Sequence, residues 1–403
     1  MAPRRPNVFV LEVQNKAALP VIESAHAHGR RVIAGAPRRY CLGFYSRSVR
    51  ERVIYPSPVD DPERCIAFLL RYLSRGHVDV LFPTDDAMTD LVARHQDAIR
   101  RHTRLVIPPY EVFSGGRDKI LTLQAAERAG VPIPRTWYPH EQGLEAVAAE
   151  AEYPCLIKPA VSAGARGMTL VNAPEELTEK LPAVEQEFGR CFVQDFVPHT
   201  DVQYKVDAVM GEGGRLLAGV VYSKLRYYPP SGGSSVLNRI VRRPDVLDLA
   251  VRVMRELKWY GFCDFDFITD PRDGLVKLME INPRYPESFR ATCVAGVDMT
   301  EMIYQLACGL DVAPQLDYRA GGFLRFLPGD LLWFLTSRDR FQQLRSFLTS
   351  FTPSVRCQIV SRRDPGPLIG YLLENLLILA SPAERATRFR LRQARQSSPS
   401  QGE

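Results

Sequence analysis

Short apolar runs alternate with longer amphipathic stretches over the first hundred residues of the chain. NVFVLEV (7–13) and RRVIAGA (30–36) have the length and β-branched content of buried strands. Helix signals lie between such runs: Asp61 precedes Pro62 at a helix start, and Gly29 and Gly76 mark helix ends. Strands that alternate with helices are typical of a parallel sheet covered on both faces. We therefore expect an N-terminal α/β domain with a parallel sheet over residues 1–115.

The pattern changes after Gly115–Gly116. Mixed short strands and helices follow, and from 203 to 283 pairs of strands are joined by turn-rich residues such as GEGG and PRDG. This predicts an α+β fold over 116–315, with one subdomain at 116–200 and another at 201–315. For residues 316–403 we expect a helical C-terminal extension with a basic tail.

Two apolar stretches of the extension, DLLWFLTSRDRFQQLRSFL and PLIGYLLENLLILA, have the pattern of amphipathic helices. Their apolar faces either pack on the preceding domain or cover a homodimer surface or a membrane surface beside the basic tail. The tail sequence AERATRFRLRQAR holds much of the formal charge of +6, and we interpret it as a solvated helix face. Because a broad basic stripe with exposed aromatic residues is missing, we expect no nucleic-acid partner.

The composition is that of a soluble globular protein, with 403 residues of which 45% are hydrophobic and 24% charged. No run approaches the ~20 apolar residues of a transmembrane helix, and the N-terminus lacks the apolar core of a signal peptide. Eight scattered cysteines form no Cys-x-x-Cys pair, which is typical of reduced core thiols and indicates a cytoplasmic location. The seven histidines lack zinc-ligand spacing.

Candidate chemistry begins with the stretch LMEINPR (278–284), where an apolar strand acquires charged groups that are costly to bury unpaired. A hairpin centred on residues 271–274 places Asp266 opposite Glu280, or within about one residue of it. Asp266, Glu280 and Asn282 then project from one face, and their oxygen atoms suit Mg²⁺ that also binds substrate phosphates. A solvent-facing side of the hairpin is the alternative, although it poorly explains so apolar a strand.

Candidate phosphate ligands lie earlier in the chain, which has no P-loop. Lys158 ends a strand in CLIKPAVSAGARGM, and the small residues of loop 162–167 let backbone N–H groups approach phosphate oxygens. Lys119 opens an earlier helix. Taken alone, the loop is equally typical of a flexible turn, and Lys119 of a solvated lysine.

The segment YSKLRYYPPSGGSS (222–235) lies between the predicted hairpins. Lys224 and Arg226 are two residues apart on an extended segment and are expected to project to the same side. We predict that this loop closes on the substrate and that Arg226 meets a carboxylate or phosphate. An ordinary surface loop is the alternative.

The order of these motifs resembles that of the ATP-grasp superfamily. Asp-Lys on a helix is followed by a strand ending in Lys-Pro with a small-residue loop, then by VQDFVP, and then by the acidic hairpin that ends in Glu-Ile-Asn-Pro-Arg. The resemblance extends from about residue 79 to 309 and is closest to carboxylate–amine ligases and their carbamoyl-phosphate-synthetase-like relatives. It implies an ATP-grasp fold after the N-terminal domain.

The resemblance also implies roles for individual residues. Lys119 and Lys158 would hold ATP phosphates, and Arg284, Arg226 and Lys224 would act on the reacting groups. The metal ligands would be Asp266, Glu280 and Asn282, with two Mg²⁺ ions bridged by Glu280, or Mn²⁺ instead. The remaining nucleotide-binding candidates belong to the lid loop, the hinge strand and a ribose-binding acid: Ser162, Ala163, Gly164, Gly167, Gln194, Asp195, Phe196, Val197 and Asp201.

The implied activity is ATP-dependent ligation of small molecules. A substrate carboxylate attacks the γ-phosphate of Mg-ATP, and an amine displaces phosphate from the acyl phosphate. One alternative is a carboxylating or carbamoylating enzyme that phosphorylates bicarbonate. The other is a nucleotide-binding regulator without turnover, which the intact metal and lysine candidates argue against.

Overall fold

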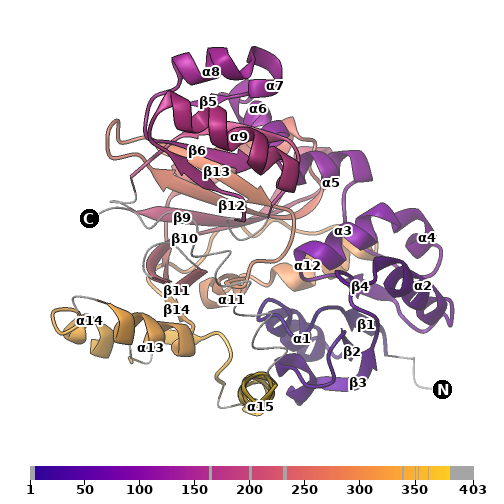
Figure 1. Ribbon diagram of the computed structural model, residues 1–403. Coiled ribbons are helices and arrows are strands. Elements are labelled where there is room, and N and C mark those ends of the chain that lie inside the picture. Colours follow the sequence, from indigo (N-terminus) through magenta and orange to yellow (C-terminus); the bar gives the residue numbers. More distant parts are fainter. Residues whose placement is uncertain are drawn as a thin grey trace.

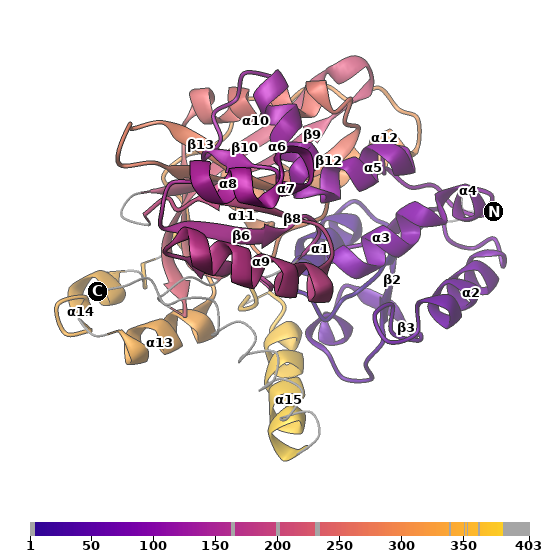
Figure 2. The same cartoon turned by 45° about the horizontal axis from the view of Figure 1, so that its top comes forward.

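The computed structural model describes residues 5–162, 166–198, 202–229, 234–337, 340–349, 351–352, 354–361 and 363–381. Figure 1 shows the N-terminal part at the lower right, a small lobe at the top, a large sheet beneath that lobe, and C-terminal helices along the lower side. Figure 2 gives the same arrangement from another side. An N-terminal α/β part is therefore followed by a two-lobed α+β fold, which confirms the predicted fold class.

The N-terminal part contains a four-stranded parallel sheet in the order β3-β2-β1-β4, as the alternation of strands and helices predicted. Asp61 caps helix α2, and its side chain accepts a hydrogen bond from the backbone N–H of Arg64 at 3.1 Å. The elements are β1 (Asn7–Val10), α1 (Ala18–Ala27), β2 (Arg31–Ala36), η1 (Leu42–Tyr45), β3 (Val49–Ile54), α2 (Pro62–Leu73), β4 (Val80–Phe82), α3 (Asp86–Arg94), α4 (Gln96–Arg100) and α5 (Tyr110–Arg117).

The small lobe has an antiparallel sheet in the order β5-β8-β6-β7, with a core of its own between the sheet and its helices. The Asp118 carboxylate caps α6 by accepting hydrogen bonds from the N–H groups of Ile120 and Leu121. The elements are α6 (Lys119–Arg128), β5 (Thr136–Trp137), α7 (Pro139–Gln142), α8 (Leu144–Glu150), β6 (Cys155–Pro159), β7 (Thr169–Val171), α9 (Pro174–Phe188) and β8 (Cys191–Asp195).

The large sheet has seven strands in the order β13-β12-β9-β10-β11-β14-β15. One face of β12 and β13 presents Phe265, Phe267, Leu278 and Ile281 to the main apolar core. The elements are β9 (Gln203–Met210), η2 (Glu212–Gly214), β10 (Leu216–Tyr228), β11 (Ser234–Val241), α10 (Pro244–Glu256), β12 (Gly261–Thr269), β13 (Val276–Asn282), α11 (Arg290–Ala295), α12 (Met299–Ala307), β14 (Phe323–Arg325), α13 (Leu327–Thr336), α14 (Leu344–Thr349), β15 (Val355–Cys357) and α15 (Gly366–Ala380).

One sequence expectation about local structure is wrong. The segment 222–235, expected to be a loop, is mostly strand: β10 runs to Tyr228 and β11 begins at Ser234. Its tyrosines and leucine favour a strand, and β10 pairs with β11 in antiparallel fashion; residues 230–233 lie outside the described ranges. After β4, residues 104–109 form no strand in the described structure, and Arg104 makes an isolated bridge with Val80.

The C-terminal segment is not purely helical, because β14 and β15 extend the large sheet. None of the helices in the described ranges is both long enough and apolar enough to cross a membrane. All eight cysteines fall in these ranges and are free thiols.

Candidate active site

The candidate site begins with the register of the β12–β13 hairpin. Asp266 pairs with Glu280, within the one-residue margin of the prediction from the turn at 271–274, and Asp264 pairs with Asn282. Directly paired residues on antiparallel strands project to the same face. A bulge follows Asp266, so that Leu278 rather than Met279 packs in the apolar core. The four polar residues therefore share the face opposite the core.

Strand β9 adds a buried lysine to this face that the sequence analysis missed. Lys205 pairs with Asp266 in the sheet, and its Nζ lies 2.7 Å from Asp264 Oδ2 and 2.8 Å from Asp266 Oδ2. Lys224 of β10 forms an ion pair with the other oxygen, Asp266 Oδ1. Burial alone would raise the pKa of Asp266, but the two ammonium groups hold it below its usual range. Asp266 is therefore ionised.

A second buried carboxyl group, Asp207, pairs with Asp264 across the sheet. The Tyr222 hydroxyl donates a hydrogen bond to Asp207 Oδ1 at 3.3 Å and lies 2.8 Å from Ser288 Oγ. Burial, and then the negative charge of Asp264, raise the pKa of Asp207 well above its ordinary value. The buried environment thus favours the protonated form of Asp207 more than water does.

Two lysines of the small lobe, on α6 and β6, also lie near this hairpin. Lys119, in the first turn of α6 after the Asp118 cap, lies 2.7 Å from the Ser162 carbonyl oxygen and 3.5 Å from Glu280 Oε2. Lys158 on β6 is buried and donates to Gln194 Oε1 at 2.6 Å. The structure thus brings together side chains of α6, β6 and β13 that lie far apart in the sequence.

The environment of Lys158 makes its charge sensitive to pH. Burial lowers the pKa of this ammonium group to about 8, Glu280 opposes the shift, and Lys119 adds to it. A lysine is charged below its pKa and neutral above it, so attraction for phosphate is lost as the pH rises through 8.

We therefore expect the affinity for ADP to fall about tenfold or more between pH 7 and pH 9.5. Isothermal titration calorimetry across this range measures the effect. In a Lys158→Met variant, ADP affinity at pH 7 should already be low and the pH dependence largely gone. An unchanged pH profile in that variant would refute the assignment of the titration to Lys158.

The hinge segment 194–197 joins the two lobes. The Asp195 carboxylate accepts hydrogen bonds from Arg272, which lies in the β12–β13 turn and also contacts Asp270. Gln194 is buried between Lys158 and Thr136, and its Nε2 donates to Thr136 Oγ1 at 2.9 Å. Phe196 and Val197 follow directly after β8.

The lid loop is described only in part. Gly167 has φ of +75° and its Cα approaches Pro159 and Phe188 so closely that a Cβ would lie 2.6 Å from the Pro159 side chain. A side chain at this position is therefore excluded on two grounds. Ser162 contacts Lys119, whereas Ala163, Gly164 and Asp201 lie outside the described residues.

Arg284, at the end of the Glu-Ile-Asn-Pro-Arg motif, reaches the N-terminal part. Its Nε donates to Asp86 Oδ1 at 3.0 Å, and a terminal nitrogen donates to Asn282 Oδ1 at 3.3 Å. Asp86 opens helix α3, just beyond the carboxyl end of β4, where ligands commonly bind at parallel sheets. The N-terminal part therefore contributes one wall beside the hairpin, and Asp86 was missed by the sequence analysis.

The placement expected for Arg226 is wrong. A register shift in β10 falls between Lys224 and Arg226, so the alternation of faces does not carry across the two residues. The Arg226 guanidinium is buried, donates to both Asp330 oxygens at 3.1 Å and lies 4.5 Å from the ring centroid of Trp333. Lys224 faces the carboxylates, whereas Arg226 binds the C-terminal segment.

The oxygen atoms of Asp266, Glu280 and Asn282 suit a cation only if other groups supply further ligands. Within the described ranges, no three histidine, cysteine or acidic groups can hold a metal ion. Glu280 is partly exposed, and Asn282 Oδ1 has one long hydrogen bond, from Arg284. Both oxygens of Asp266 already face ammonium groups, so a cation there competes with Lys224. These residues fit Mg²⁺ that takes its remaining ligands from phosphate oxygens and water.

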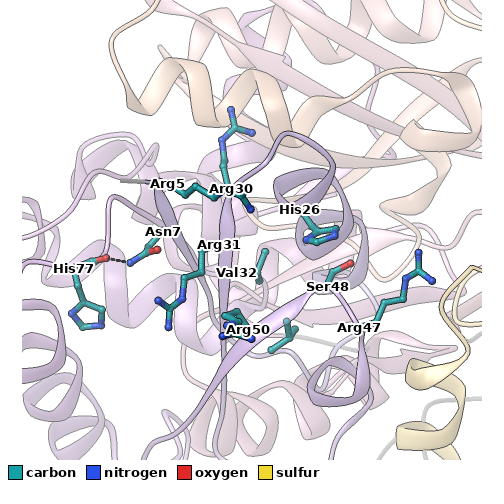
Figure 3. A pocket seen from close by; sticks show the side chains of 11 residues that line it. Arg5, Asn7, His26, Arg30, Arg31, Val32, Arg47, Ser48, Arg50 and His77 are labelled. Atoms are coloured by element: carbon teal, nitrogen blue, oxygen red, sulfur yellow. Dashed lines mark hydrogen bonds between the residues drawn. The ribbon is translucent and has the colours of Figure 1, made fainter. Parts of the chain in front are cut away.

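A cavity of about 630 Å³ elsewhere in the molecule is distinct from this site (Figure 3). It lies around the amino ends of β1, β2 and β3, the edge of the parallel sheet opposite Asp86. Its lining includes Arg5, Arg30, Arg31, Arg47 and Arg50, and no candidate site residue.

Two family models match the chain. The model described as "ATP-grasp in the biosynthetic pathway with Ter operon" matches residues 188–321. The model of the carbamoyl-phosphate synthase L chain, ATP-binding domain, matches residues 118–206. Together they cover the small lobe and the part of the large sheet that holds the hairpin.

Similar curated proteins include two enzymes. The chain is 28% identical to the formate-dependent phosphoribosylglycinamide formyltransferase of Ignicoccus hospitalis over an aligned region of 242 residues. This region covers 56% of this chain and 58% of that protein. It is 24% identical to the D-aspartate ligase of Enterococcus faecium over an aligned region of 300 residues, and this region covers 69% of this chain and 70% of that protein. The match to the first enzyme thus spans less than two thirds of its length.

Among solved structures, the fold is similar to that of biotin carboxylase from Campylobacter jejuni. The TM-score is 0.66 at 16% identity, over 78% of this chain and 74% of that chain. The N-terminal parallel sheet and both lobes therefore agree with a known architecture. The two family models, which together match residues 118–321, assign this part of the chain to the ATP-grasp superfamily, and the solved structure agrees with them in fold.

Proposed function

We propose that this protein is an ATP-dependent carbon–nitrogen ligase that activates a small carboxylate as an acyl phosphate and joins it to an amine, with release of ADP and phosphate. The observation that supports this most is the convergence of Lys119 and Lys158 from the small lobe on Glu280 of the large sheet. Cations and a carboxylate at a junction between two lobes suit a metal-bound triphosphate.

In this proposal Lys119 and Lys158 hold the nucleotide phosphates, loop 162–167 serves as a lid, and residues 194–197 bind adenine. Asp266, Glu280 and Asn282 would hold one or two Mg²⁺ ions, or Mn²⁺, which would neutralise charge on the transferred phosphoryl group. Asp201, as the ribose ligand, completes the nucleotide site.

Lys224 neutralises Asp266 in the structure. If Asp266 held a cation, the Lys224 ammonium group would be available to orient the attacking carboxylate. Arg284, held by Asp86, faces the transferred phosphoryl group and stabilises the charge that develops on it. Arg226 has no catalytic role in this proposal, because its guanidinium is bound to Asp330.

The experiment that tests this function measures ADP release from Mg-ATP with pools of carboxylic acids, with and without amines. Hydroxylamine is added as a general acceptor, because it converts an acyl phosphate to a hydroxamate that is readily detected. We expect ADP release that needs a carboxylate, and a new amide when the correct amine is present. ADP release that needs only bicarbonate would favour the carboxylating alternative, and no release with any acid or bicarbonate would contradict the proposal.

A further inference from the structure

Exposed apolar side chains are concentrated in the C-terminal segment. Of the 23 large apolar side chains that are exposed in the described ranges, 13 lie between Leu331 and Leu379. They come from α13, α14, α15 and the residues next to these helices. Exposed apolar side chains gathered in this number in one segment indicate a site of interaction with a protein or a membrane.

Helix α15 has two opposite faces. Pro367, Gly370, Glu374 and Ile378 are buried and recur at helical spacing. At Gly370 the packing against η1 is so close that a Cβ would lie 2.7 Å from the Tyr45 ring. The opposite stripe, formed by the exposed residues Ile369, Leu372, Leu376 and Leu379, points away from the protein.

Helix α13 has the same construction. Its buried residues are Gly329, Asp330 and Trp333, and its exposed leucines are 331, 332 and 335. Figures 1 and 2 both place α13, α14 and α15 along the lower side of the molecule, and Figure 1 shows the small lobe at the opposite, upper side. Because the buried face of α13 contacts Arg226 of β10, its exposed leucines point away from the large sheet.

Positive charge is concentrated in the same segment. Residues 331–403 contain eleven arginines and five acidic residues, so this segment carries a formal charge of +6, which equals that of the whole chain. Five of these arginines follow α15 directly, within residues 385–395. Asp364, just before α15, accepts a hydrogen bond from the backbone N–H of Arg47 at 3.1 Å, and Arg47 lines the cavity of Figure 3 with other arginines.

We propose that the C-terminal segment binds the surface of a bilayer that contains anionic lipids. The stripe of α15 and the exposed leucines of α13 enter the headgroup region, and the arginines bind lipid phosphates. With 15 residues, α15 fits a helix lying in the interface. A second copy of the chain is a poorer occupant, because face-to-face pairing would bring two segments of charge +6 together.

Co-sedimentation of the full chain with vesicles tests this inference. We expect at least about tenfold more binding to phosphatidylcholine vesicles with about 30% phosphatidylglycerol than to phosphatidylcholine alone. The variant L372E/L376E should lose about tenfold or more of this binding, since it places two charges in the apolar stripe. R388E/R390E/R392E should reduce binding to the level seen with phosphatidylcholine alone.

The matched control is L310E/L316E, which changes two leucines of similar exposure outside the segment and should bind vesicles as the unchanged chain does. Thermal unfolding of each variant checks that it is folded. Equal binding by L372E/L376E, or no preference for anionic vesicles, would overturn the inference. So would a dimer, detected by analytical ultracentrifugation, that L372E/L376E dissociates. None of these measurements depends on ligase activity.

Discussion

A Glu280→Gln variant should release ADP and phosphate from ATP at least about 100-fold more slowly than the unchanged protein. The substitution keeps the shape of the side chain but removes the negative charge next to Lys119 and the oxygen proposed to bridge the metal ions. Asp266 and Asn282 would remain, but Asp266 already neutralises two ammonium groups. Phosphate release under saturating Mg-ATP and substrate is the measurement.

A matched control is available on the surface of α10. Glu256 is also half of an ion pair, with Arg128, and its side chain is 35% exposed, compared with 37% for Glu280. Glu256→Gln should keep full activity, and both variants should unfold at nearly the same temperature. If Glu280→Gln retained the activity of the Glu256→Gln control, the proposed metal site would be wrong.

An Asp330→Ala variant should lose about 3–5 kcal/mol of stability, which is the usual cost of removing one partner from a buried ion pair. Asp330 is fully buried, and its carboxylate binds Arg226 at 3.1 Å and Arg325 at 2.6 Å. These arginines are 5% and 1% exposed, so both guanidinium groups would lose the carboxylate that they share in an environment poor in water. Urea unfolding measures the change.

Asp311→Ala is the control for this experiment, because Asp311 pairs with Arg215 at 2.8 Å but is 88% exposed. We expect a change within about 0.5 kcal/mol there, as for most surface substitutions. A loss for Asp330→Ala no larger than that of Asp311→Ala would show that the carboxylate is not needed to hold Arg226. Arg226 would then again be a candidate for substrate binding.

The register of the acidic hairpin could be predicted from the sequence only to within about one residue. The turn PRDG sets the pairs next to it, such as Phe267 with Leu278, and at constant register it would place Met279 opposite Asp266. The bulge after Asp266, which no residue pattern announced, places Glu280 there and so brings Asp266, Glu280 and Asn282 to one face. By contrast, the approach of Lys119 and Lys158 to Glu280 depends on how two lobes pack. No spacing along the chain encodes that contact, and only the order of motifs suggested it.

Lys205 was missed although the sequence carried a signal. QYKVDAVM places a lysine and an aspartate two residues apart in an otherwise apolar strand, the same kind of exception that made LMEINPR informative. Arg226 was misplaced for a different reason. A β-bulge changes which face a residue occupies without leaving a recognisable pattern in the residues around it, so the period of two failed between Lys224 and Arg226.

Strand β14 pairs with β11 through Leu237, Asn238 and Arg239, and β15 then borders β14. The same sheet therefore continues without a break from the acidic hairpin into the C-terminal segment. If the chain ended after residue 315, β11 would become an exposed edge strand. Its unpaired backbone donors and acceptors could then pair with a strand of another molecule. By covering β11, strands β14 and β15 of the C-terminal segment therefore protect the large sheet from aggregation.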